Sequence, residues 1–275
     1  MSGKKKKKKG TPIFVILLIV CLAVAGFSAY KLISIGLTYK AGEDEYADLQ
    51  KYTVEKTQDT DEASEENTDD AESTPESTEE SESGGVPLTV DVAGLKAVNP
   101  DFAGWLYIAA EDISYPMVHY TDNDYYLHRT FEKADNFAGT IFIDYQNNGD
   151  LTDPNTIIYG HNMKNDSMFG KLQLLYENGD YAKDDTFWII TEEGAYKYRM
   201  FSMQVTSSDS PVYTLYSAPC QEFMDYITAR ASESAVQLPL GEYNENSKVV
   251  TLSTCWGTGE DGSRFVVQGI LLGVY

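Results

Sequence analysis

Nineteen consecutive residues without a charged side chain, Pro12 to Tyr30, constrain the fold of this chain more than any other feature. Six consecutive lysines, Lys4 to Lys9, precede them. A helix of this length, at about 1.5 Å per residue, nearly spans the roughly 30 Å hydrocarbon core of a bilayer. Clustered lysines tend to stay on the cytoplasmic side. The sequence therefore predicts a basic cytoplasmic tail at residues 1–11 and a single-pass transmembrane anchor at 12–37. The rest of the chain would lie outside the cell.

A cleaved signal peptide is the alternative interpretation of this N-terminus. The small residues Ala23, Val24 and Ala25 could form a cleavage site. The apolar stretch continues well past them to Leu37, however, which favours an anchor that stays attached.

Acidic and hydroxyl side chains dominate residues 38–86. Between Ala41 and Val86, seventeen acidic residues stand against two lysines, for a net charge of −15. Thr68 to Gly85 has almost nothing apolar to bury, so the segment cannot offset the entropy of ordering. We therefore predict a disordered linker, extended by like-charge repulsion, that lifts the next domain off the membrane. An acidic interaction tail is the alternative, and Ala41 to Lys56 could instead form a short helix that continues from the membrane.

The remaining 189 residues, 87–275, suffice for one domain with a sizeable core. They carry 11 basic and 26 acidic side chains, a net charge of −15. An acidic domain without a basic stripe argues against nucleic acid as a partner.

Short runs rich in β-branched and aromatic residues recur through this domain, separated by Gly, Asn and Asp turns. This pattern is typical of a mostly β fold, a β-barrel with peripheral helices. Helical spacing of apolar residues predicts helices at 90–99, 166–176 and 219–232. The predicted strands cover 104–108, 115–119, 139–143, 156–159, 187–191, 195–205, 249–253 and 265–274.

Three chemically active residues stand at the ends of predicted strands. Cys255 closes the strand that begins at Val249, Arg264 opens the next strand, and His161 follows the apolar run Thr156 to Tyr159. Neighbouring strands would bring the thiol and the guanidinium to one rim of the sheet. A thiol, an imidazole and an arginine together make a nucleophilic site with an anion stabiliser. Plain packing is the alternative role for a single cysteine.

Cysteine and histidine spacing favours this site over a disulfide framework or a metal. Only Cys220 and Cys255 lie outside the predicted membrane span. A bridge between them is conceivable and would inactivate the site, and an inert packing role is the simpler interpretation of Cys220. No CxxC or HxxxH spacing occurs, so we expect neither a metal nor another cofactor. His119 and His128 lack the apolar lead-in of His161.

The segment Thr251-Leu252-Ser253-Thr254-Cys255 resembles the TLxTC signature of sortases, the cysteine transpeptidases of Gram-positive cell surfaces. His161 and Arg264 fall where that family places its other two catalytic residues. The chain from about Asn99 onward resembles class B sortases in particular, through Asn99 to Leu106 and Asp122 to Leu127. The resemblance implies a closed sortase-type β-barrel, with a class B helix in the connection that precedes the cysteine strand.

The resemblance also implies the reaction. Cys255 would cleave a C-terminal sorting signal after threonine and form a thioacyl enzyme. An amine of a peptidoglycan precursor, or of a pilin, would then resolve this intermediate. The partners would be surface proteins that carry the signal, the wall precursor and the membrane lipid. A cationic His161 would increase the thiolate fraction of Cys255 and then protonate the leaving amine. Arg264 cannot deprotonate and would donate to an oxyanion.

Four further residues match family positions that line the signal groove, namely Asn123, Leu127, Tyr159 and Ser253. Alternation along a strand places Ser253 on the same sheet face as Cys255. Core packing is the alternative for Leu127 and Tyr159. The loop at 209–218 cannot be aligned residue by residue, although it is expected to form one groove wall.

Two other classes of function remain in view. A papain-type cysteine peptidase would use the same Cys–His pair, but its signature is absent and here His161 precedes Cys255. A non-catalytic surface receptor could share the anchor and linker, but would not require Cys255, His161 and Arg264 together.

Overall fold

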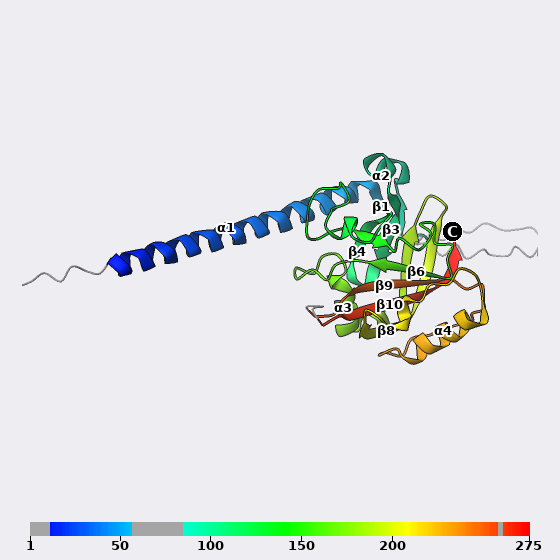
Figure 1. The fold of residues 1–275 in the computed structure, drawn as a ribbon. Coiled ribbons are helices and arrows are strands. Elements are labelled where there is room, and N and C mark those ends of the chain that lie inside the picture. The colour runs from blue at the N-terminus through cyan, green and yellow to red at the C-terminus, as the bar shows by residue number, and fades with distance from the viewer. Residues whose placement is uncertain (1–11, 57–84, 258–260) are drawn as a thin grey trace, which may run out of the picture. The chain divides into compact units, whose positions relative to one another are not determined.

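The computed structural model describes residues 12–56, 85–257 and 261–275. It divides the chain into two compact units, with the boundary between Glu45 and Tyr46. One long helix, α1 (Pro12–Leu49), contains this boundary (Figure 1).

Most of the described N-terminal unit is the apolar part of α1. The large side chains of this part are exposed all round, and its most apolar 18-residue stretch has a mean hydropathy of 2.3 and no buried share. Among the described residues, α1 is the one helix that is long enough and apolar enough to cross a bilayer, as its composition predicts. The helix is consistent with a single-pass membrane anchor. The lysine-rich tail at 1–11 lies outside the described residues.

The start of the predicted linker differs from the expectation of disorder over 38–86. Helix α1 continues to Leu49, and the short η1 (Gln50–Tyr52) leads into β1 (Thr53–Glu55). Strand β1 pairs antiparallel with β2 (Leu88–Val90). The physical reason is local: Tyr46 and Leu49 are buried in the second unit, and the Gln50 side chain donates to the Ser114 carbonyl at 2.9 Å. The rest of the predicted linker, 57–84, lies outside the described residues.

Eight strands form a closed barrel in the order β10-β8-β7-β3-β4-β5-β6-β9 (Figure 1). Most neighbours are antiparallel, whereas β4 with β5 and β6 with β9 are parallel. The predicted mostly β, closed-barrel fold is confirmed. The strand bounds are β3 (Phe102–Ile108), β4 (Ile113–His119), β5 (Ile141–Ile143), β6 (Asn155–Tyr159), β7 (Thr186–Ile190), β8 (Ala195–Ser207), β9 (Val249–Cys255) and β10 (Ser263–Val274).

Peripheral helices accompany the barrel as predicted, with shorter bounds than the apolar spacing gives. They are α2 (Val92–Val98), α3 (Gly170–Glu177) and α4 (Gln221–Ser232), with the short turns η2 (Ala109–Glu111), η3 (Tyr125–Leu127), η4 (Asp180–Ala182) and η5 (Pro211–Tyr213). Helix α3 starts four residues later than predicted because Asp166 and Met168 have φ of 57° and 53°, which a right-handed helix does not allow.

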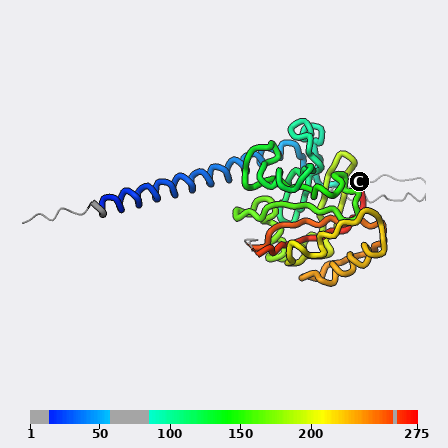
Figure 2. Tube along the Cα trace, in the orientation of Figure 1, coloured from blue at the N-terminus to red at the C-terminus, as the bar shows by residue number. Residues whose placement is uncertain are grey.

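Helix α4 covers one part of the barrel (Figure 2). Its inner face is Phe223, Tyr226 and Ile227, the three residues that the sequence predicts, and they pack against Phe201 and Val249. The helix lies in the connection between β8 and β9, so it is part of the framework that holds the cysteine strand.

Candidate active site

Strands β9 and β10 place Cys255 and Arg264 directly opposite each other. The two are register partners at the end of the antiparallel ladder that also pairs Ser253 with Val266. Just beyond it, the Trp256 amide donates to the Ser263 carbonyl at 3.1 Å. This ladder fixes the thiol and the guanidinium at one rim of the barrel.

Strand β6 brings His161 to the same rim. It runs parallel to β9, and its last register pair joins Tyr159 to Ser253. The Gly160 amide then donates to the Ser253 carbonyl at 3.1 Å, and His161 follows. A Cβ on Gly160 would come within 2.7 Å of the Phe169 ring, so only glycine fits here without rearrangement.

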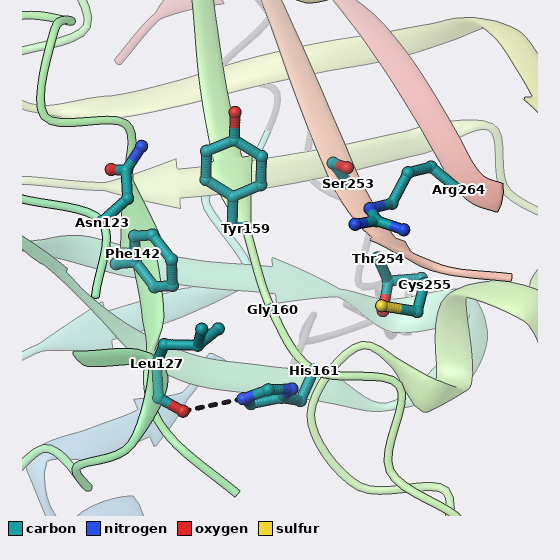
Figure 3. A pocket seen from close by; sticks show the side chains of 10 residues that line it. All are labelled: Asn123, Leu127, Phe142, Tyr159, Gly160, His161, Ser253, Thr254, Cys255 and Arg264. Carbon is teal, nitrogen blue, oxygen red and sulfur yellow. Dashed lines mark hydrogen bonds between the residues drawn. The ribbon is translucent and has the colours of Figure 1, made fainter. Parts of the chain in front are cut away.

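A pocket of about 300 Å³ opens at this rim (Figure 3). All seven residues that the sequence predicts as catalytic or substrate-binding line this pocket. Phe142, Gly160 and Thr254 also line it, and the sequence does not predict them as site residues. Gly160 and Thr254 adjoin predicted site residues in sequence, but nothing in the sequence singles out Phe142. The seven predicted lining residues are Asn123, Leu127, Tyr159, His161, Ser253, Cys255 and Arg264.

The His161 imidazole is held by one backbone group. Its Nε2 lies 2.7 Å from the Leu127 carbonyl oxygen, which can only accept, so this nitrogen carries a proton. In the neutral ring Nδ1 is then the acceptor, and Figure 3 shows it on the side of the ring away from Leu127. Burial lowers the pKa of His161 below its ordinary value, the Leu127 bond opposes this, and His128 adds to it. The neutral ring is therefore favoured before substrate binds, in contrast to the cation expected from sequence.

The Cys255 thiol and the Arg264 guanidinium are both partly buried and directed into the pocket (Figure 3). Cys255 is a free cysteine, and so is Cys220, which packs against the α4 cluster. The guanidinium Nη1 donates to the Ser263 carbonyl at 3.0 Å. Within residues 12–56, 85–257 and 261–275, Arg264 forms no ion pair, so most of its donors are available to the pocket.

A chain of polar contacts builds the wall opposite the cysteine. The Asp144 carboxylate accepts from Asn123 Nδ2 at 2.9 Å and from the Tyr159 hydroxyl at 3.1 Å. The Tyr159 ring stacks on Tyr213, with centroids 6.3 Å apart, and the Tyr213 hydroxyl lies 2.8 Å from Ser253 Oγ. Burial raises the pKa of both tyrosines, and the nearby Arg264 opposes the rise. Both phenols therefore stay protonated at neutral pH.

Sequence reasoning missed Asp144 and Tyr213. Asp144 follows a buried strand, but its link to Asn123 and Tyr159 exists only in the folded chain. Tyr213 belongs to η5, inside the loop at 209–218 that the sequence analysis expects at the groove wall. No group of His, Cys, Asp and Glu side chains suited to a metal ion occurs in the part of the chain that the structure describes.

A closed eight-stranded barrel with a thiol, an imidazole and an arginine around one rim pocket defines a class of cysteine-dependent enzymes. Similarity to known proteins identifies this class. The Sortase domain family matches residues 106–272, so the chain belongs to the sortase family. Its relatives place it in class B, and it is a sortase-type cysteine transpeptidase.

Three relatives illustrate the similarity. Sortase B of Listeria monocytogenes is 33% identical over 184 residues, which are 66% of this chain and 74% of the relative. The crystal structure of Clostridium perfringens sortase B superposes with a TM-score of 0.60 at 29% identity, over 66% of this chain and 99% of that one. The Staphylococcus aureus sortase B–substrate complex shares the fold, with a TM-score of 0.61 at 24% identity, over 67% of this chain and 85% of that one.

Proposed function

We propose that Cys255 is the nucleophile, His161 the proton carrier and Arg264 the oxyanion donor of a transpeptidation that cleaves a C-terminal sorting signal after threonine. The observation that carries this proposal is the convergence of the three side chains on one pocket from three strand ends. A purely structural role for these three residues would not require their reactive groups to line the same open pocket.

The tautomer of the neutral His161 ring indicates which of its nitrogens exchanges protons with Cys255 and the substrate. With Nε2–H held by Leu127, Nδ1 of the neutral ring accepts the thiol proton as Cys255 attacks the scissile carbonyl carbon. The new C–S bond leaves a tetrahedral oxyanion. When the C–N bond breaks, Nδ1–H gives its proton to the departing amine and a thioacyl enzyme remains. The acceptor amine then attacks the thioester, its proton passes to Nδ1, and the thiol regains that proton as it leaves.

Arg264 is suited to the oxyanion because it stays charged at all relevant pH values and presents a fork of N–H donors. Its register position opposite Cys255 supports this role, because the guanidinium then lies on the same sheet face as the proposed nucleophile. The absence of a carboxylate partner among the described side chains supports this role over a surface ion pair.

The groove residues have two kinds of role in this proposal. Leu127 and Tyr159 offer apolar and aromatic surface to the signal peptide. The polar atoms of Asn123 are bonded to Asp144 and to the Tyr145 amide, and Ser253 Oγ is bonded to Tyr213. These bonds fix the orientation of both side chains at the groove wall, and the Asn123 amide keeps a second N–H beyond the one bonded to Asp144.

The proposed partners are surface proteins with a C-terminal sorting signal and an amine of a peptidoglycan precursor or a pilin. The substrate complex of the Staphylococcus aureus relative, which shares the fold, supports the first of these. The apolar part of α1 supports attachment to the membrane. We propose that the lysine-rich N-terminus is cytoplasmic and that the domain after α1 acts outside the cell.

The test uses the full-length chain in detergent, a library of threonine-containing sorting-signal peptides, and triglycine as the amine probe. We expect cleavage after threonine and, when triglycine is present, a ligated product in place of the hydrolysed one. Hydrolysis that triglycine does not divert would support a peptidase, and no cleavage of any peptide would support a receptor.

A further inference from the structure

The parallel ladder between β6 and β9 ends before it reaches Cys255. Its last register pair is Tyr159 with Ser253, and its last backbone bond runs from the Gly160 amide to the Ser253 carbonyl. Beyond this point, pairing with β10 continues on the other side of β9 as far as Cys255. The chain that carries the thiol is thus free of strand pairing on the side from which His161 comes.

Two side-chain amides take the place of that missing pairing. Gln173 Nε2, on α3, donates to the Cys255 carbonyl at 2.7 Å. Asn162 Nδ2, next to His161, donates to the Gly257 carbonyl at 3.1 Å. The two carbonyls flank Trp256, so the two amides hold both ends of the short segment that leaves the strand.

Both amides belong to the same segment as His161. The Phe169 amide, at the start of α3, donates to the His161 carbonyl at 3.0 Å, and Asn162 and Met168 form an isolated β-bridge. Phe169, Leu172 and Leu175 are fully buried, which fixes α3 in the core. The segment from His161 to Gln173 therefore carries the imidazole and, through two side-chain amides, holds the backbone at Cys255 and Gly257.

We propose that Gln173 and Asn162 are positioning residues that hold Cys255 at its working separation from His161; we call the pair the amide clamp. This role rests on the proposed function of Cys255 and His161 and adds the device that sets their geometry. Each amide acts through the backbone and touches no reacting atom. Loss of the clamp lets the end of β9 move on the His161 side, where no ladder holds it.

The sharpest variant is Gln173→Met, because methionine keeps the length and helix propensity of glutamine and removes the side-chain amide that donates to Cys255. The matched control is Lys171→Met. Lys171 lies on the same helix and also donates to a carbonyl, that of Asp112 at 2.9 Å, away from Cys255. A second variant, Asn162→Ala, tests the other half of the clamp.

Two measurements on the full-length chain in detergent decide the proposal. The first is amide hydrogen exchange of peptides that cover Trp256 and Gly257, which needs no substrate. We expect faster exchange in Gln173→Met and Asn162→Ala, and wild-type exchange in Lys171→Met. The second is kcat and KM on a peptide that the wild type cleaves. We expect kcat to fall up to about tenfold in Gln173→Met, with KM changed less than about twofold, since one hydrogen bond to the nucleophile strand is lost.

Unchanged exchange at Trp256 and Gly257, or a kcat equal to that of Lys171→Met, would overturn the clamp. A rise in KM at constant kcat would also overturn it, because that pattern belongs to a groove residue. If the wild type cleaves no peptide, the proposed function fails, and hydrogen exchange alone still decides whether Gln173 and Asn162 hold the strand.

Discussion

Cys255 and Arg264 are cross-strand partners in the last register pair of the β9–β10 ladder. Side chains of directly opposed residues on one antiparallel pair lie on the same face, with Cβ atoms about 4.5–5.5 Å apart. The guanidinium therefore needs no long-range contact to stay beside the thiol. The sheet itself sets this half of the site, whereas His161 lies two residues past the end of β6 and is also held by the Leu127 carbonyl and the Phe169 amide.

Cys255→Ala should abolish cleavage and ligation and leave the fold intact, because it removes the proposed nucleophile and little volume. Peptide cleavage followed by mass spectrometry is the measurement, with the thermal midpoint as a check on folding. Cys220→Ala is the control, since Cys220 packs beside α4 and lines no part of the pocket. Cleavage that persists in Cys255→Ala would remove the cysteine from the mechanism.

His161 should make the folded state sensitive to acid. Burial lowers its pKa below the value of about 6.5 in the unfolded chain. Between these two pKa values the unfolded chain binds more protons, so stability present above about pH 6.5 is lost as the pH falls through this window. His161→Gln keeps a donor for Leu127 and has no titration here.

Thermal midpoints at about pH 7.5 and pH 5.5 test this sign. We expect the wild type to lose more stability than His161→Gln over that interval, because only the wild type has the buried imidazole to protonate. Equal losses would show that the imidazole titrates as it does in the unfolded chain.

Tyr226→Phe should destabilise the framework that holds β9. The Tyr226 hydroxyl accepts from Gln268 at 2.6 Å and from Asn155 at 3.1 Å, and it donates to the Val212 carbonyl at 2.8 Å. Its removal leaves one N–H of the buried Gln268 amide without an acceptor, because only the other N–H has Thr251 Oγ1 as a partner, at a cost of about 1–3 kcal/mol in the free energy of unfolding.

Tyr216→Phe is the control for this change. The Tyr216 ring packs on Phe223 at 5.1 Å, but in the described part of the chain its hydroxyl forms no hydrogen bond. We expect an effect within about 0.5 kcal/mol in urea unfolding. Equal effects of the two substitutions would show that the Tyr226 hydroxyl contributes nothing beyond its ring.

The N-terminal span should remain attached to the mature protein. The uncharged run extends past the possible cleavage site at Ala23 to Ala25, and the structure continues it as one helix to Leu49. Intact-mass measurement of the membrane-extracted protein should therefore give the uncleaved chain. A mature start near Gly26 would show that the span is a signal peptide.

The elements that sequence predicts well are those set by local pattern. β-Branched runs give the barrel strands, and the strand ends carry Cys255, Arg264 and His161 to the pocket. Composition averages mislead where a few apolar residues matter: Tyr46 and Leu49 lie in a strongly acidic stretch, yet both are buried in the second unit.

Contacts between distant residues stay hidden from sequence. Gln173 bonds a carbonyl 82 positions away, and Tyr213 meets Ser253 across 40 positions. Neither residue differs in type or spacing from an ordinary polar or aromatic residue of a helix or loop. Only the closure of the barrel creates these pairs, so pattern reasoning finds the reactive groups and misses what orients them.

Arg264 provides the last test, because the structure supports a functional role for it over an ordinary ion pair. No acidic side chain among the described residues pairs with it, and exposed pairs contribute only about 0–1 kcal/mol in any case. Loss of one oxyanion donor typically costs roughly 10²–10³ in rate, or about 2.7–4 kcal/mol. We therefore expect Arg264→Ala to cut transpeptidation by that factor with little change in thermal midpoint.

Arg264→Lys separates charge from geometry. Lysine keeps the positive charge but replaces the rigid planar fork with a compact ammonium whose N–H donors have no fixed planar arrangement. We expect only partial recovery of kcat relative to Arg264→Ala, measured with the same peptide and amine. Full recovery would show that charge alone is required at this position. Wild-type turnover in Arg264→Ala would exclude the arginine from the chemistry and leave Cys255 and His161 to act with another donor.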